Sequence, residues 1–205
     1  MKDMTITYEV GTALYVNITN RCSNRCEFCI RNNGDGAYGS DSLWLEKEPT
    51  REEILDSIVS RDLAKYTELV FCGYGEPTER LEDMIYVAKQ IKAKYALPVR
   101  VNTNGQSSLL YGKDTAPMYA DAFDTVSISL NAPNAEEYDR VCHSKFGLAA
   151  YNGLLDFAAR VKNYVPNVML TVVDVALTPA EIEQCKQIAE GAGVPLRVRK
   201  YIGKE

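Results

Sequence analysis

The chain alternates short apolar runs with longer segments of helical period, and this alternation limits the folds open to it. Most of the short runs are apolar at nearly every position, which is typical of parallel strands buried on both faces. Six β/α repeats joined by right-handed crossovers would form either an open sheet or a partial barrel. The expected strands are Ala13–Thr19, Glu68–Cys72, Pro98–Asn102, Thr125–Leu130, Val168–Val173 and Leu196–Tyr201, with Thr5–Val10 as a candidate for an extra strand.

Helix start signals separate these runs. Two segments begin with a capping box, in which a threonine at the N-cap is followed three residues later by a glutamate. These pairs are Thr50 with Glu53 and Thr178 with Glu181. Gly191 and Gly193 are expected to end the second of these helices. Further helical stripes are predicted at Leu81–Ile91 and Leu154–Val161, with short helices from Asn134 and around Pro117–Ala122.

Composition excludes several classes of protein. The chain has 205 residues, 46% hydrophobic and 25% charged, which is typical of a globular protein and most simply of one domain, residues 1–205. With a net charge of −5, a nucleic-acid partner is not expected. We expect neither a signal peptide nor a membrane-spanning helix, and so no membrane association. The six cysteines are therefore expected to be reduced thiols or metal ligands in a cytoplasmic protein.

Three cysteines, Cys22, Cys26 and Cys29, lie in one short run with the spacing C-x-x-x-C-x-x-C. Iron–sulfur clusters are usually held by four thiolates, so three clustered thiolates favour a 4Fe–4S cluster in which one iron has no protein ligand. An open coordination position is typical of catalytic metal sites. A structural zinc site would need a fourth ligand, and the chain offers no second C-x-x-C pair and one histidine, His143. Zinc is therefore disfavoured.

Polar residues and glycines follow the expected strands at the point where each strand ends. These segments are Cys72–Pro77, Asn102–Gly105 and Ser127–Asn131. In parallel β/α folds, ligands bind at the C-terminal ends of the strands. Gly73 and Gly75 carry no Cβ, so backbone there can approach a ligand, and Glu76 can accept from an ammonium group or from backbone donors. Neutral groups suited to hydroxyls and carboxylates are offered by Asn102, Asn104, Ser129 and Asn131.

Taken together, the Cys22–Cys29 run, the Gly73–Pro77 segment and the Asn102–Gly105 strand end resemble the radical S-adenosylmethionine (SAM) superfamily of enzymes. The resemblance covers essentially the whole chain. The sequence segments 15–22 and 29–36 resemble a narrower group, the TatD-associated radical SAM proteins. What the resemblance implies is an α/β fold, a partial (β/α)6 TIM-like barrel of parallel strands that forms a single radical SAM core domain.

The resemblance also implies a 4Fe–4S cluster and SAM as cofactors. Three irons would be bound by Cys22, Cys26 and Cys29, and the methionyl amine and carboxylate of SAM would chelate the fourth. The expected activity is reductive cleavage of SAM to a 5′-deoxyadenosyl radical, which abstracts hydrogen from a substrate. Residues expected to contact SAM are Phe28, Gly73, Gly75, Glu76, Asn102, Ser129 and Asn131. Tyr74 stands where a glycine is common in the family.

An electron donor such as flavodoxin or ferredoxin is implied by this chemistry, whereas the substrate is left open. The opening of a six-stranded barrel leaves room for a large substrate such as a peptide or protein. Two alternative functions stay open: an activase for a glycyl-radical enzyme, and a non-catalytic iron–sulfur protein for electron transfer or sensing. The Gly73–Glu76 segment disfavours the second, because an electron carrier needs no amine-binding strand end.

The other three cysteines are interpreted from their surroundings. Cys72 lies inside an apolar strand and Cys185 follows the helical spacing of its neighbours, so both are expected to be buried in the core. Cys142 lies next to His143, which suggests an auxiliary ligand pair or a contact to substrate. Two isolated ligands do not hold a cluster, however, so a purely structural role is preferred.

Two further features have two interpretations each. Arg197 and Arg199 alternate on one face of the last strand, where they either bind an anionic substrate or pair with surface carboxylates. The irregular stretch 31–49 is long for a compact domain, and such loops are usually functional or mobile. Its aromatic residues, Tyr38 and Trp44, either line a lid over the site or anchor the loop by packing.

Overall fold

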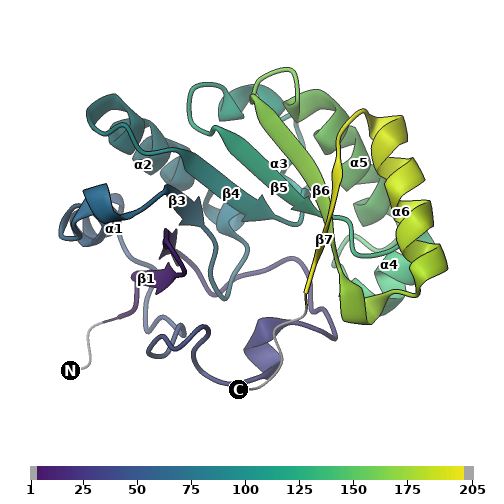
Figure 1. The fold of residues 1–205 in the computed structure, drawn as a ribbon, viewed down its shortest axis with the longest axis horizontal. Coiled ribbons are helices and arrows are strands. Elements are labelled where there is room, and N and C mark those ends of the chain that lie inside the picture. The colour runs from purple at the N-terminus through teal and green to yellow at the C-terminus, as the bar shows by residue number, and fades with distance from the viewer. Residues whose placement is uncertain (1–3, 201–205) are drawn as a thin grey trace.

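The computed structural model describes residues 4–200 and contains a seven-stranded sheet whose strands follow one another in chain order (Figure 1). The first strand pairs antiparallel with the second, and all later neighbours are parallel. This is the partial (β/α)6 TIM-like barrel predicted, with one antiparallel strand added at its edge. The strands are β1 Thr7–Val10, β2 Ala13–Val16, β3 Glu68–Phe71, β4 Val99–Thr103, β5 Thr125–Ser129, β6 Asn167–Val173 and β7 Leu196–Arg199.

Every predicted strand is present, and most are shorter than predicted. β2 ends at Val16 rather than Thr19, because the chain leaves the sheet there to enter the cysteine loop. β4 instead continues to Thr103, which lies beyond its predicted end. The candidate extra strand is β1, which forms a hairpin with β2. Tyr201, the last residue of the predicted seventh strand, lies outside the described residues.

Within residues 4–200, six α-helices connect the strands, and most begin where the sequence signals predict. Both capping boxes are present, at Thr50 and at Thr178. Gly193 ends the last helix in a left-handed conformation with φ of 71°, but Gly191 lies inside that helix and does not end it. The helices are α1 Arg51–Val59, α2 Leu81–Lys94, α3 Ser107–Tyr111, α4 Ala135–Cys142, α5 Ala149–Val161 and α6 Pro179–Ala192. Short 3-10 helices are Ile30–Asn32, Leu63–Lys65, Pro77–Arg80, Ala116–Tyr119 and Asp174–Ala176.

The helix α3 was not predicted. It is five residues long and begins with two serines, so it is too short to show an apolar stripe of helical period. The short helix predicted around Pro117–Ala122 is a 3-10 turn that begins and ends slightly earlier.

The two faces of the sheet bury different kinds of side chain. The helices cover one face, and the irregular chain between β2 and α1 crosses the other (Figure 1). The helix-covered face forms the main apolar core, with Leu14 and Phe71 among its fully buried members. On the concave face a smaller cluster lies around Tyr15 and Val70, over the first strands. Polar side chains of β4, β5 and β7 consequently face a cavity.

Two asparagines, the buried Asn17 and the partly buried Asn20, hold the irregular segment 31–49 against the end of β2. The Asn17 side-chain amide donates to the Leu43 carbonyl at 2.7 Å. The Asn20 amide donates to the Leu45 carbonyl at 2.8 Å and accepts from the Leu45 N–H at 3.1 Å. These bonds satisfy backbone groups that no strand partner reaches, so the segment has a defined path over the concave face.

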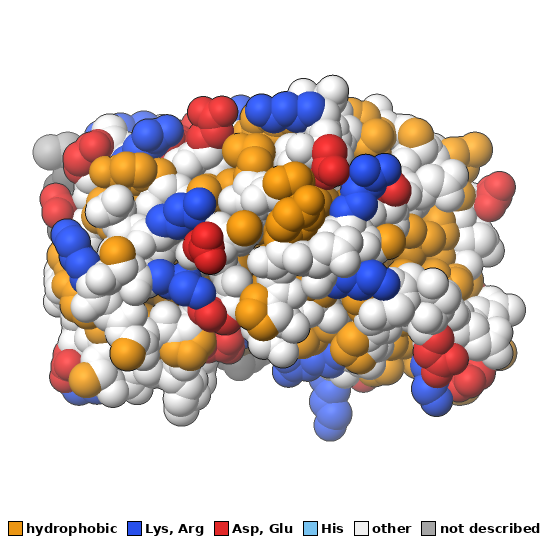
Figure 2. All heavy atoms as spheres, turned by 90° about the horizontal axis from the view of Figure 1, so that it is seen from above, with side chains coloured by type: hydrophobic (Ala, Val, Ile, Leu, Met, Phe, Trp, Pro, Cys, Tyr) orange, Lys and Arg blue, Asp and Glu red, His pale blue; other side chains and the backbone are white. Residues whose placement is uncertain are grey.

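No helix among residues 4–200 combines the length and apolar character needed to cross a membrane. On the face seen in Figure 2, acidic and basic side chains are interspersed rather than gathered by sign. Nucleic-acid-binding surfaces instead gather basic side chains on one face, so this face does not have that character.

A buried arginine joins the end of β2 to α2. The Arg80 side chain is 9% exposed and donates to the Ile18 carbonyl at 3.1 Å. Its guanidinium also pairs with Asp83 at 2.6 Å, and Arg51 contacts the other oxygen of the same carboxylate. Burial raises the pKa of the Asp83 carboxyl, but the bonds from Arg51 and Arg80 outweigh burial and hold this pKa below its ordinary value of 3.8.

We predict that Asp83→Asn lowers the free energy of unfolding at pH 7 by about 2 kcal/mol, since charged hydrogen bonds to a buried arginine are lost. The depressed pKa means that this contribution is present above pH 3.8 and is lost as the pH falls through the lower folded pKa. Urea unfolding of both proteins at several pH values measures the difference, which should shrink in acid. Asp156→Asn, on the exposed face of α5, is the control and should change stability little.

Candidate active site

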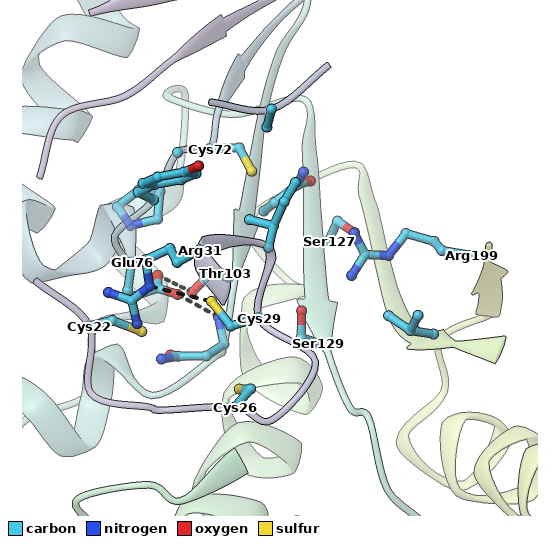
Figure 3. Close-up of a pocket in the computed structure, with 18 of the residues that line it drawn as sticks. Cys22, Cys26, Cys29, Arg31, Cys72, Glu76, Thr103, Ser127, Ser129 and Arg199 are labelled. Carbon is cyan, nitrogen blue, oxygen red and sulfur yellow. Dashed lines mark hydrogen bonds between the residues drawn. The ribbon is translucent and has the colours of Figure 1, made fainter. Parts of the chain in front are cut away.

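One cavity on the concave face is lined by the strand ends at which the sequence predicts a ligand site (Figure 3). Its volume is about 520 Å³, which is in the range of small-molecule sites. The structure brings all ten predicted site residues to its walls: Cys22, Cys26, Phe28, Cys29, Gly73, Gly75, Glu76, Asn102, Ser129 and Asn131. Which ligand each residue contacts stays a prediction at this point.

The three cysteines of the loop lie around one side of this cavity (Figure 3). Two of their sulfurs already accept hydrogen bonds, from the Asn24 N–H to Cys22 Sγ at 3.4 Å and from Arg31 Nε to Cys29 Sγ at 3.3 Å. Burial, with a smaller contribution from the nearby Glu76 charge, raises the pKa of the Cys22 thiol to about 12. Donors aimed at the sulfurs stabilise thiolates and influence the reduction potential of iron–sulfur clusters.

The end of α4 packs directly behind the cysteine loop. The Cys142 thiol acts to raise the pKa of the Cys26 thiol, and the Arg25 N–H donates to the Cys142 carbonyl at 2.9 Å. Cys142 is fully buried, whereas His143 is half exposed with its Nε2 3.4 Å from a carboxylate oxygen of Glu27. The two neighbours therefore do not converge on a shared ligand. Cys142 instead supports the loop.

A buried polar network fixes the loop from below, and the sequence did not reveal it. Gln106 donates to the Asn24 side chain at 3.0 Å and to the Tyr138 hydroxyl at 2.9 Å, and Asn24 donates to the same hydroxyl at 3.0 Å. Ser23 donates to Gln106 at 3.0 Å and accepts from Asn104 at 2.8 Å. Because every partner is satisfied, this network holds the loop in one conformation. Asn104, predicted for a ligand, is one of its members.

Glu76 links the ends of β3 and β4. Its carboxylate is buried and accepts hydrogen bonds from the Thr103 hydroxyl at 2.7 Å, the Thr78 hydroxyl at 2.8 Å and N–H at 3.2 Å, and the Asn104 N–H at 2.8 Å. Burial raises the pKa of this carboxyl, and the hydrogen bonds offset only part of the increase. Of the two predicted types of partner, an ammonium group or backbone donors, the structure shows backbone donors, and it adds two hydroxyl donors that were not predicted. Glu76 positions the strand ends that line the cavity.

The two glycines of the β3 end are required by a close approach of the chain itself. A Cβ on Gly73 would lie 2.1 Å from the Asn17 side-chain oxygen. A Cβ on Gly75 would lie 2.2 Å from the Thr19 carbonyl and 2.6 Å from the Arg21 carbonyl. Both glycines therefore let the segment that leads into the cysteine loop pack against the β3 end, and this packing leaves their backbone at the cavity wall.

Tyr74, between these glycines, anchors the irregular segment 31–49. It is 3% exposed, and its hydroxyl donates to the Gly34 carbonyl at 2.6 Å. The Trp44 ring meets the Tyr74 ring edge-on at 5.0 Å. Trp44 thus holds the loop by packing, while Tyr38 lines the cavity. Of the two interpretations of these aromatic residues, anchoring by packing describes Trp44, and a place at the wall of the site describes Tyr38.

Two polar side-chain atoms in the described part of the chain are buried without a hydrogen-bond partner, and both belong to residues of this cavity. They are Oδ1 of Asn131 and Nε of Arg199. Buried polar groups without partners are rare in folded proteins, and each calls for a physical explanation. One is an acceptor at the end of β5 and the other is a donor at the end of β7. The cavity can therefore take a ligand with a donor at one end and an acceptor at the other.

The arrangement of the three cysteines bears on the kind of metal site that they could form. Within residues 4–200, no three His, Cys, Asp or Glu side chains come close enough to bind a single metal ion. In an iron–sulfur cluster each thiolate binds a different iron, so the sulfurs stand further apart than the ligands of one ion. Three thiols around one side of a cavity are a donor set that fits such a cluster.

The cavity also includes residues with other predicted roles. Cys72 is only partly buried and lines the cavity, so its expected burial in the core was wrong. Its strand position faces the concave side, which the sequence pattern alone does not identify. Cys185 is fully buried in the core, as predicted. Arg197 and Arg199 both line the cavity.

We predict that Gly75→Ala lowers the free energy of unfolding by about 1–3 kcal/mol, because the added methyl group would overlap two backbone carbonyls that have no room to move. Urea denaturation measures this change. The matched control is Gly191→Ala in α6, where a Cβ meets nothing within 4 Å. That change should leave stability equal or higher by up to about 1 kcal/mol. Equal stability of Gly75→Ala and wild type would contradict the close approach.

Comparison with known proteins identifies relatives of this chain. A curated relative, "Probable GTP 3′,8-cyclase" from Thermococcus kodakarensis, is 28% identical over 190 residues, which are 91% of this chain and 56% of the relative. A second, "Tungsten-containing aldehyde ferredoxin oxidoreductase cofactor-modifying protein" from Pyrococcus furiosus, is 27% identical over 182 residues, 86% of this chain and 46% of that protein. The chain thus spans about half the length of these curated relatives.

Among solved structures, Streptococcus suis SuiB bound to the precursor peptide SuiA superposes with a TM-score of 0.69. The match covers 93% of this chain and 39% of SuiB at 15% identity, which shows a shared fold alone. The sequence model of the family described as "Radical SAM superfamily" matches residues 16–190. This match includes the cysteine loop and the ends of β3, β4 and β5. The chain belongs to the radical SAM superfamily of enzymes.

Proposed function

We propose that this chain binds a 4Fe–4S cluster through Cys22, Cys26 and Cys29 and binds SAM in the adjoining cavity. The observation that carries the proposal is the convergence of three cysteines, a glycine-lined strand end and the unpartnered Asn131 oxygen on one cavity. When bound and reduced, the cluster supplies the electron that cleaves SAM to a 5′-deoxyadenosyl radical for hydrogen abstraction from a substrate. The rest of the proposal concerns what the chain's own residues contribute.

The cysteine loop is suited to hold a cluster with one iron left open. Three thiolates leave one iron of a 4Fe–4S cluster without a protein ligand, and the amine and carboxylate of SAM are the groups proposed for that position. The Arg31 guanidinium, hydrogen-bonded to Cys29 Sγ, would stabilise negative charge on the cluster. The fixed network behind Asn24 would keep the loop in place when the metal is lost or gained.

The proposed SAM contacts follow from the chemistry of the cavity walls. The backbone of Gly73 and Gly75 is assigned to the methionyl amine, and Phe28 to the apolar surface beside adenine. Neutral side chains are assigned to the ribose and carboxylate: these are Asn102, Ser129 and Asn131. A ribose hydroxyl would give Asn131 Oδ1 the donor that it lacks. Glu76 is assigned a positioning role, since its oxygens are already hydrogen-bonded.

The irregular segment 31–49 closes part of the cavity and would exclude water from the reaction. Its anchors, Tyr74 and Asn20, hold it at the cavity rim. The proposed partners are an electron donor such as flavodoxin or ferredoxin and a substrate of open identity, for which a peptide or protein stays a candidate. Residues 1–205 are proposed to form one radical SAM core domain, of the TatD-associated kind.

We predict that anaerobically reconstituted wild-type protein, reduced with dithionite in the presence of SAM, produces 5′-deoxyadenosine. Cys26→Ala should lower this product by at least about a hundredfold and reduce bound iron, because the cluster loses one of three ligands. The matched control is Cys185→Ala, a cysteine buried in the core away from the cavity, which should retain iron and product formation. Mass spectrometry measures the nucleoside, and a colorimetric assay measures iron.

The same preparation tests the alternative of a non-catalytic cluster. SAM bound to an open iron should change the EPR spectrum of the reduced protein even where turnover requires a substrate. A full complement of iron, no 5′-deoxyadenosine and a spectrum unchanged by SAM would together overturn the proposal.

We predict that Asn131→Gly weakens SAM binding by about five- to tenfold, the loss expected for one hydrogen bond. Glycine keeps the left-handed conformation at this position, where φ is 56°, and removes only the side chain. Equilibrium binding of SAM to the reconstituted protein measures the effect, while bound iron should stay the same. Asp121→Gly is the control, because Asp121 is exposed and has a similar φ of 60°. An unchanged SAM affinity in Asn131→Gly would contradict the assignment.

A further inference from the structure

The half of the cavity formed by the later strands has a basic wall. Arg197 and Arg199 lie two residues apart on β7, so both side chains project from the same face of the strand. In the register of the sheet they stand beside Thr171 and Val173 of β6. Both arginines line the cavity, and so does Lys200. This wall lies at the end of the strand order opposite to β2, where the chain enters the cysteine loop.

The cations of this cavity differ in how far they are neutralised. Arg100 of β4 pairs with Glu68 at 2.7 Å and bonds to the Tyr15 hydroxyl at 3.4 Å, so its charge has a partner. Arg197 and Arg199, by contrast, have no ion pair within residues 4–200, and Arg199 Nε is buried with no acceptor. The sequence left two interpretations of these arginines. Within the described residues, the structure does not show the pairing with surface carboxylates.

The Arg199 side chain extends from β7 into the cavity and points toward β5, where Ser127 and Ser129 lie (Figure 3). Ser127 is buried and adds a hydroxyl donor to this region. Burial raises the pKa of the Tyr38 hydroxyl to about 12 while the Arg199 charge acts to lower it, which places the guanidinium within electrostatic range of the loop wall. The donor that lacks a partner thus faces the open space between the two sides of the cavity.

We propose that Arg199, with Arg197 and the Ser127 hydroxyl, forms a subsite that binds an oxyanion group of the substrate. The proposal rests on the proposed function, in which SAM takes the half of the cavity beside the cysteines. A guanidinium offers two parallel N–H donors that match phosphate and carboxylate oxygens, and Arg199 Nε is one of those donors. Arginine is preferred over lysine where such an anion must be oriented as well as attracted.

The charge and the walls of the subsite narrow the substrate class. Arg197, Arg199 and Lys200 are cations without a carboxylate partner among the described residues, so a phosphate of about −2 charge is favoured over a singly charged carboxylate. The opposite wall presents the rings of Tyr8, Tyr15 and Tyr38, which suit a flat or apolar substrate body. The expected substrate is a small molecule that carries a phosphate ester on such a body.

Binding of simple oxyanions to the reconstituted holoprotein tests the subsite. Calorimetric titration with pyrophosphate, phosphate and acetate, each at the same ionic strength in potassium chloride, should show saturable binding of the phosphates and weaker binding of acetate. Arg199→Gln should weaken pyrophosphate binding by at least about tenfold, the loss expected for a charge-assisted pair. Arg160→Gln, on the outer surface of α5, is the control and should bind as wild type does. Acetate bound more tightly than phosphate would overturn the choice of a phosphate ester.

A second variant keeps the test independent of folding. Arg199→Lys retains the charge but loses the forked donors, so its affinity should fall between wild type and Arg199→Gln. Wild-type affinity in both variants, or no saturable binding by wild type, would overturn the subsite. Pyrophosphate bound through Arg199 by iron-loaded protein that does not cleave SAM and whose EPR spectrum SAM leaves unchanged would support the subsite and reject the proposed function. SAM cleavage by protein that does not bind pyrophosphate through Arg199 would support the proposed function and reject the subsite.

Discussion

The buried carboxylate of Glu76 is the constraint on which the site depends. A carboxylate in a water-poor interior is costly unless donors surround it, and here the donors come from its own strand end and from the next one. The bonds to Thr103 and Asn104 fix how the ends of β3 and β4 stand relative to each other. Asn104 in turn bonds to Ser23 of the cysteine loop. One charged group thereby connects the glycine-lined wall to the segment that carries the three cysteines.

Much of the fold and of the candidate site could be predicted because both depend on local patterns. The strands are short runs rich in apolar residues, and the polar residues at their C-terminal ends lie at one edge of the sheet. The supporting contacts could not be predicted, because Gln106 meets Asn24 across 82 positions of the chain and Asn24 meets Tyr138 across 114. The orientation of Cys72 was missed for a related reason: nothing in an all-apolar strand says which face is concave.

The two glycines at the end of β3 have a packing role that the sequence analysis did not predict. Gly73 and Gly75 were expected to allow a ligand near the backbone, and they do line the cavity. Their Cβ positions, however, are occupied by the chain between β2 and the cysteines. Tyr74 between them bonds through its hydroxyl to the loop that covers the cavity. The same short segment therefore packs the cysteine loop, forms the cavity wall and holds the cover.

The two unpartnered polar atoms mark the division of the cavity between two ligands. Asn131 Oδ1 is an acceptor, which suits a hydroxyl of the cofactor, and Arg199 Nε is a cationic donor, which suits an anion. An anionic group held at β7 would keep the substrate body between the basic wall and the SAM half of the cavity. Since a radical abstracts hydrogen only at short range, anchoring the substrate at its far end selects which of its atoms meets the cofactor. On this argument β7 determines which position of the substrate reacts, while residues at the ends of β2 to β5 bind the cofactors.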